Sequence, residues 1–166
     1  SQRRFGRKRW VPAVAAILVL AMVSIVFVLN QGSEKDLYAS YYEPLSGKHI
    51  STTVRGGSEE AELKAIGEMF ATKDFEAALP AINSFLENAP ETIDLKLYRG
   101  ICLLEKEDTE SAIQDFVAVA ESNSVFKDQA MWYLALSLIK TDKKEEAKTW
   151  LSNLRDRGEF KVKEAK

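Results

Sequence analysis

The sequence predicts an all-α protein in which one membrane-spanning helix precedes a short α-solenoid of three helical hairpins. The first observation is a repeat: similar turns are each followed by an alanine, at Ala78, Ala112 and Ala147, with spacings of 34 and 35 residues. Each alanine belongs to a unit of two short amphipathic segments, and a period of this length is typical of stacked helical hairpins. The second observation is an almost uninterrupted apolar run at residues 11–29, which is long enough to cross a bilayer.

The predicted transmembrane helix comprises residues 10–30. The run contains no charged residue, and Trp10 stands where an interfacial aromatic residue is expected. A buried core helix would carry an amphipathic pattern, which this run lacks. A cleaved signal peptide would have a shorter apolar region followed by a small-x-small site, and residues 28–32 do not form a clean site. The pattern therefore favours an uncleaved anchor, with the lipid bilayer as its partner.

The charges around this helix predict its orientation. Residues 1–9 form a basic tail with five positive charges, whereas the far side of the helix begins with Glu34. The positive-inside rule then places the N-terminus in the cytoplasm and the rest of the chain across the membrane. We therefore expect a single-pass protein of the bacterial inner membrane with a periplasmic domain. Beyond residue 30 the chain carries 18 basic and 25 acidic residues, a balance that disfavours nucleic acid as a partner.

Residues 31–58 form the predicted juxtamembrane connector. Glycines and a proline interrupt any helix there, but the segment is more aromatic than a plain flexible linker. Its tyrosines are Tyr38, Tyr41 and Tyr42. We expect these rings to pack against another surface. Either the repeat domain or the membrane interface could provide that surface.

The repeat domain is predicted to occupy residues 59–166. Apolar periodicity and turn residues place helices at 59–72, 75–88, 92–106, 109–122, 126–140 and 143–155. Residues 160–166 look like the start of a further helix, of the kind that would cap the last apolar face of a solenoid.

The repeats resemble the tetratricopeptide repeat (TPR) family. The resemblance rests on small residues, turn residues and large apolar residues at corresponding places: Gly100, Asp108, Ala112 and Phe116 in the middle unit, Asp74, Phe75, Ala78, Leu79, Ile82 and Pro90 in the first, and Leu134, Ala135, Leu138, Ala147 and Leu151 in the third. Three residues depart from the family pattern, namely Ile66, Arg99 and Ser124. The layout of the whole chain resembles small membrane-anchored TPR proteins of bacterial envelopes, including some from Bacteroidetes.

The resemblance implies an all-α solenoid that binds proteins or peptides in a groove lined by the first helix of each hairpin. Transferred residue by residue, the groove positions are Leu63, Phe70, Leu97, Ile101, Leu104, Trp132, Leu136 and Ile139. Some family members hold a partner's terminal carboxylate with Lys, Arg and Asn at such positions, whereas this sequence has Leu63, Leu97 and Ile101 there. The alternative is that these residues are ordinary interhelix core.

A second apolar face on the middle helix, formed by Leu95, Tyr98 and Cys102, predicts burial on both sides of that helix. Something should therefore cover the groove. We expect the chain's own residues 37–45 to do so, with Tyr38, Tyr41 and Tyr42 resting on apolar groove residues.

The sequence offers little for catalysis. Its single histidine, His49, lies in the connector without a framing motif, and its single cysteine, Cys102, lies within an apolar helix. We find no metal-binding, nucleotide-binding or catalytic motif, and expect no enzyme activity, metal or cofactor. The expected function is that of a membrane-anchored adaptor or scaffold. The alternatives are a regulatory subunit that senses across the membrane, and a protein resembling a mitochondrial import receptor with cytosolic repeats.

Overall fold

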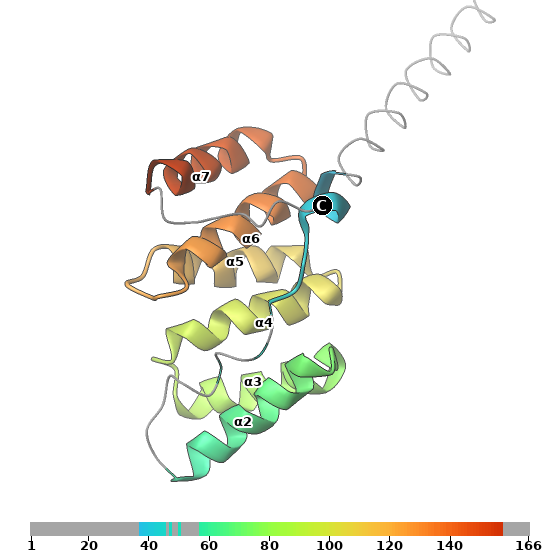
Figure 1. The fold of residues 1–166 in the computed structure, drawn as a ribbon, viewed down its shortest axis with the longest axis vertical. Helices are drawn as coiled ribbons and strands as arrows, with labels where there is room; N and C mark the ends of the chain where they lie inside the picture. The colour runs from blue at the N-terminus through green and yellow to red at the C-terminus, as the bar shows by residue number, and fades with distance from the viewer. Residues whose placement is uncertain (1–36, 46, 48–49, 51–56, 158–166) are drawn as a thin grey trace, which may run out of the picture.

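The computed structural model describes residues 37–45, 47, 50 and 57–157. Within these ranges the protein is all α-helical, as the sequence predicts. The helices are α2 (Gly57–Ala71), α3 (Phe75–Asn88), α4 (Ile93–Glu105), α5 (Thr109–Ala120), α6 (Lys127–Lys140) and α7 (Lys144–Arg157) (Figure 1). Each helix boundary lies within two residues of its predicted position.

Two predicted segments fall elsewhere in the chain. The transmembrane helix at 10–30 and the last helix at 160–166 both lie outside the described residues. Among the helices that are described, none combines the length and the apolar character needed to cross a membrane.

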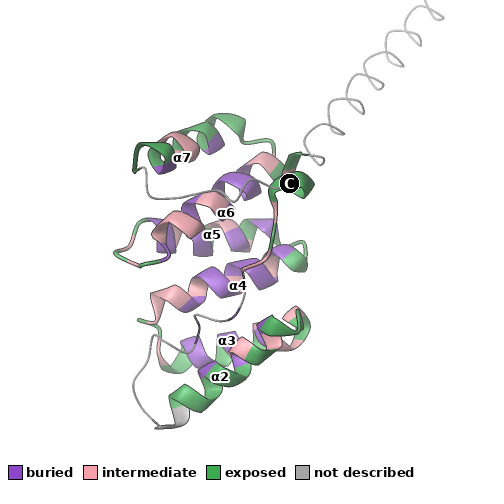
Figure 2. Ribbon diagram, in the orientation of Figure 1, coloured by how far each residue is buried: buried purple, intermediate pink, exposed green. Residues whose placement is uncertain are grey.

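The helices form a layered stack in which each helix packs against the next one in sequence (Figure 1). Buried residues concentrate on α4, α5 and α6 in the middle of the stack, and exposed residues are more frequent on α2 and α7 (Figure 2). The three alanines of the repeat pattern are buried in this stack. Their exposed fractions are 0% for Ala78, 0% for Ala112 and 1% for Ala147.

The same tight turn joins the two helices of each pair. Its central residue has a left-handed backbone, with φ of 58° at Lys73, 63° at Glu107 and 60° at Asp142. The next residue donates its backbone N–H to the carbonyl five positions earlier, over 2.8 Å for Asp74–Met69, 2.9 Å for Asp108–Leu103 and 2.8 Å for Lys143–Leu138. These bonds satisfy carbonyls that a helix end would otherwise leave unpaired. The repeat in sequence is therefore also a repeat in backbone geometry.

Two of these turns also start the following helix with an aspartate cap. The side chain of Asp74 accepts the backbone N–H of Ala77 over 3.1 Å, and that of Asp108 accepts the N–H of Ser111 over 3.2 Å. Each cap satisfies one of the free N–H groups at the beginning of a helix. The third turn has Lys143 at this position.

Helices α4 and α5 approach closely because Gly100 has no side chain. A Cβ atom at Gly100 would lie 2.5 Å from Cε1 of Phe116, whose ring is completely buried. In the first pair the corresponding residues are Ile66 and Ile82, both buried. The first pair thus has an isoleucine on each helix at these positions, whereas the second pair has glycine on one helix and an aromatic ring on the other.

Arg99, the second departure from the pattern, forms an ion pair between α4 and α5. Its Nε and Nη2 atoms donate to the two carboxylate oxygens of Asp115 over 2.7 and 2.6 Å. The Asp115 side chain is 6% exposed and that of Arg99 is 28% exposed. Hydrogen bonding to Asp115 raises the pKa of the Arg99 guanidinium. The charged pair therefore replaces an apolar contact.

Candidate functional site

The predicted groove residues lie on α2, α4 and α6, and most of them are buried. Leu97 and Ile101 are 0% exposed, and Leu63, Leu136, Phe70 and Leu104 are at most 3% exposed. Trp132 and Ile139 are half-buried and pack against the core. The apolar face of these three helices is therefore covered.

Part of that cover comes from the segment that precedes α2. We call the described residues 37–45, 47 and 50 the connector segment. A short helical stretch at residues 37–41 opens it, and the chain then runs past α6 and α4 toward α2 (Figure 1). It thus meets the third helix pair first and the first helix pair last.

At α6 the connector segment is held by aromatic contacts. The ring of Tyr41 meets Trp132 edge-on, with centroids 6.2 Å apart, and the ring of Tyr42 meets Tyr133 in the same way at 6.0 Å. The hydroxyl of Tyr133 also donates a hydrogen bond to the backbone carbonyl of Glu43. These contacts combine apolar burial with edge-to-face ring geometry, which aromatic pairs prefer.

At the end of α4 the connector segment makes a side-chain bond to a carboxylate. The hydroxyl of Tyr42 donates to Oε1 of Glu105 over 2.7 Å. Tyr38 stacks on Tyr42 with centroids 5.0 Å apart. The ammonium group of Lys140 lies 5.1 Å from the centre of the Tyr38 ring, which is within the range of a cation–π contact.

At α2 the backbone of the connector segment lies close to the backbone of the helix. A Cβ atom at Gly47 would lie 2.5 Å from the carbonyl oxygen of Gly67 and 2.7 Å from Cβ of Phe70. Only glycine fits this position without a shift of the chain. Ile50 follows at 3% exposure, so this end of the connector segment is part of the core.

We call the residues that hold the connector segment the connector seat: Gly67, Phe70, Glu105, Trp132, Tyr133 and Lys140. Sequence analysis named Phe70 and Trp132 as groove residues, but it did not single out Glu105, Tyr133 or Lys140. Trp132 meets Tyr41, whereas Phe70 meets Gly47 and packs its ring against Phe75 and Tyr98. The role of Gly47 was also missed, because a glycine in a connector is typical of any loop.

The electrostatics of the seat keep its phenols protonated. Burial raises the pKa of Tyr42, Tyr38 and Tyr133 above the ordinary value of 10.0, and the carboxylate of Glu105 raises it further for Tyr42 and Tyr38. A phenolate beside Glu105 would place two negative charges together in a partly desolvated site. The hydroxyls therefore act as donors.

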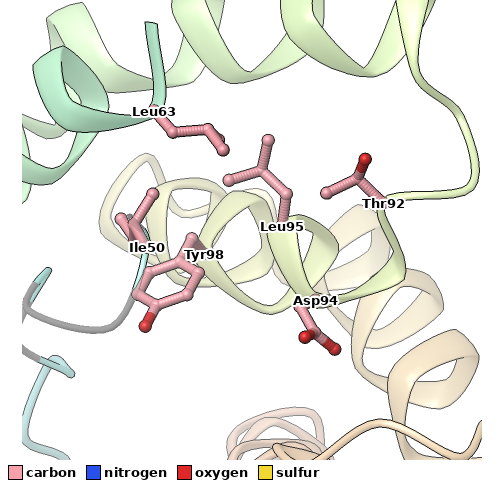
Figure 3. A pocket seen from close by; sticks show the side chains of 6 residues that line it. All are labelled: Ile50, Leu63, Thr92, Asp94, Leu95 and Tyr98. Atoms are coloured by element: carbon pink, nitrogen blue, oxygen red, sulfur yellow. The ribbon is translucent and has the colours of Figure 1, made fainter. Parts of the chain in front are cut away.

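A small cavity of about 10 Å³ lies where the connector segment meets α2 and α4. It is lined by Ile50, Leu63, Thr92, Asp94, Leu95 and Tyr98 (Figure 3). This volume suits about one water molecule. The Tyr98 hydroxyl is buried without a hydrogen-bond partner among the described residues, and Figure 3 shows it pointing away from Leu95 and Thr92.

The single cysteine of the chain is not part of the seat. Cys102 is completely buried, and burial raises the pKa of its thiol to about 12, so the thiolate that would react is suppressed. The described residues contain no group of three or more His, Cys, Asp or Glu side chains suited to a metal ion. His49 lies outside those residues.

Comparisons with known proteins leave the site to be interpreted on its own geometry. The chain matches no protein-family model, no curated protein and no solved structure. The connector seat is thus defined by its contacts alone: a row of rings, one carboxylate and one ammonium group, spread over three helices.

Proposed function

We propose that this chain is a membrane-anchored protein–protein interaction module, an adaptor or scaffold built as a TPR-like α-solenoid. The observation that carries the proposal is the connector segment, which already lies across α2, α4 and α6 as a bound peptide would. Side chains from α4 and α6 and the backbone of α2 hold it in place. A face that holds one peptide by such contacts is suited to peptide binding in general.

The three identical turns at residues 73, 107 and 142 support the solenoid part of the proposal. Units that repeat in backbone geometry stack with a constant offset and create an extended binding face. The chemistry of the seat supports binding rather than turnover, since aromatic rings fix a ligand but transfer nothing to it. The anchor and the extracytoplasmic side are proposed from residues 1–30, whose charge and apolar pattern favour that arrangement.

Site-specific photocrosslinking in the native host tests the proposed binding face. A photoreactive amino acid replaces Ile139, which is half-buried on α6, and in a control it replaces the exposed Gln114 on α5. We expect a discrete crosslinked product from position 139 and none from position 114. Equal products from both positions, or none from position 139, would contradict the proposal.

The proposed topology has its own test. A reporter fused after Lys166 should behave as periplasmic, and protease added to intact spheroplasts should digest the repeat domain. Reporter activity in the cytoplasm would exclude this placement, although it would leave the binding face untouched.

A further inference from the structure

The connector segment has one tight end and one loose end. At α2, Gly47 and Ile50 are buried, with Gly47 pressed against the backbone of Gly67. At α6, Leu37 is 44% exposed and Tyr41 is 48% exposed. The bond between Tyr42 and Glu105 is also exposed. Residues 47 and 50 are thus buried, whereas residues 37–45 are exposed or half-buried.

This difference in burial determines which part of the connector segment can dissociate from the helices. Exposed hydrogen bonds and ring contacts contribute little each, because water competes for the same groups. The buried end at α2 has no such competition. Residues 37–45 can therefore lift from α4 and α6 while residues 47 and 50 stay in place.

We propose that residues 37–45 are a displaceable internal ligand, and that the vacated seat binds a tyrosine-containing peptide of a partner protein. This inference rests on the proposed function and names the chemistry of its ligand. The partner peptide carries two tyrosines four residues apart on one helical turn, as Tyr38 and Tyr42 do. An extended stretch follows, with a free backbone carbonyl for Tyr133.

Each part of the seat selects one feature of that ligand. Glu105 accepts a hydrogen bond from the tyrosine hydroxyl, which a phenylalanine at that position cannot donate. Lys140 favours the face of an aromatic ring over an aliphatic side chain. Trp132 is only half-buried under the edge of Tyr41, so a partner with a larger side chain can cover more of it.

Tethering explains why the seat is closed in the isolated chain. A segment joined to its site by a short linker has an effective concentration on the order of millimolar. A free peptide with the same contacts must exceed that concentration to compete. The partner therefore needs either extra contacts at Trp132 or a connector segment that has been weakened.

The test uses the full chain in detergent micelles and a fluorescein-labelled peptide with the sequence of residues 37–45, LYASYYEPL. The opened variant carries Tyr38→Ala and Tyr42→Ala, which weaken the internal ligand and leave the seat unchanged. We expect fluorescence anisotropy to show at least tenfold tighter peptide binding by the opened variant than by the wild-type chain. The Gly47→Ala variant opens the segment from its other end and should also bind more tightly than wild type.

Selectivity is measured with a second peptide in which phenylalanine replaces the tyrosine at the position of Tyr42. We expect it to bind the opened variant about twofold to fivefold more weakly, which is the effect of one exposed hydrogen bond. Adding Glu105→Ala to the opened variant should remove the difference between the peptides. Adding Glu110→Ala, an exposed acid on α5, should preserve it.

Several results would overturn the inference. Equal peptide affinity for wild type and both opened variants would show that the connector segment does not compete. Absence of binding to folded variants, checked by circular dichroism, would show that the seat takes no peptide in trans. A partner crosslinked at position 139 would then still support the proposed function. A doubled mass in mixtures of opened and wild-type chains would assign the seat to a second copy instead.

Discussion

Gly67 and Gly100 each allow a close contact with their helix backbone, but the group that makes the contact differs. Both lie on the first helix of a pair, and both let another group approach the helix backbone closely. Gly100 receives Phe116 from the helix that follows it, so its contact belongs to the repeat itself. Gly67 receives Gly47 from a segment outside the repeats. The comparison teaches that the solenoid has two kinds of close contact, one that builds each unit and one that attaches the connector segment.

The largest expected effect is on the contact inside the repeat. Gly100→Leu places atoms where the buried Phe116 ring lies, because even a Cβ would stand 2.5 Å from it. We expect a loss of about 3 kcal/mol in unfolding free energy, as for severe overpacking of a core. Chemical denaturation of the full chain measures it. Gly100→Ala and Gly67→Ala are the matched pair. A Cβ at Gly67 would lie 3.2 Å from its nearest atom, the carbonyl oxygen of Gly47, and we expect a much smaller loss there.

The ion pair between α4 and α5 should give the second largest effect. Asp115→Ala leaves Arg99 partly buried without its carboxylate, and we expect a loss of about 2 kcal/mol. The double variant Arg99→Leu and Asp115→Leu should recover most of the stability, because an apolar pair of similar size often replaces a buried ion pair without loss. Thermal melting compares the three proteins. A double variant as unstable as Asp115→Ala would contradict this explanation.

The contact between Gly47 and Gly67 lies outside the repeat. Disturbing it should lower the stability less than the changes above, but it should expose more apolar surface. Gly47→Ala would bring a Cβ within 2.5 Å of the Gly67 carbonyl oxygen, so the connector segment must shift. We expect a loss of about 1 kcal/mol, at the low end for overpacking, with increased binding of a hydrophobic dye. A variant with wild-type dye binding would mean that the segment tolerates the added methyl group.

The smallest expected effect is a change of the unfolding free energy with pH, and it is absent at neutral pH. Folding raises the pKa of Tyr42 and Tyr133 above their ordinary value of 10.0, so the folded state holds these protons more tightly than the unfolded state does. The associated stability is complete below pH 10 and falls as the pH rises above it. Denaturation midpoints between pH 8 and 11 should show this fall, and Tyr42→Phe should make it shallower. An unchanged slope in that variant would contradict the assignment.

The repeat could be predicted from the sequence because its buried positions recur at a fixed spacing. Ala78, Ala112 and Ala147 recur at a spacing close to the length of one helix pair, and burial of each follows from that position. The left-handed residues of the turns were not predicted, since Lys73 and Glu107 are unusual in a conformation that favours glycine. Backbone hydrogen bonds, which any residue can make, hold them there.

The connector seat could be predicted from the sequence only in part. Aromatic residues in a loop predict that the loop packs against something, which drew attention to Tyr41 and Tyr42. Trp132, one of the predicted groove residues, does meet Tyr41. The hydrogen-bond partners could not be predicted, because the bond to Glu105 spans 63 residues and the bond from Tyr133 to Glu43 spans 90. No periodicity relates such positions. Arg99 was interpreted as a departure from a pattern for the same reason, since its partner Asp115 lies on a different helix.

The route of the connector segment has a consequence for how the molecule unfolds. In a linear array of repeats each unit stabilises only its neighbours, so the end units can open while the middle stays intact. Here Tyr41 lies against α6 and Gly47 lies against α2. The connector segment therefore contacts both the third helix pair and the first. Opening either end then disturbs the other. A stack that would open gradually from its ends is therefore coupled across its length while residues 37–45 are in place, and it loses that coupling when they leave.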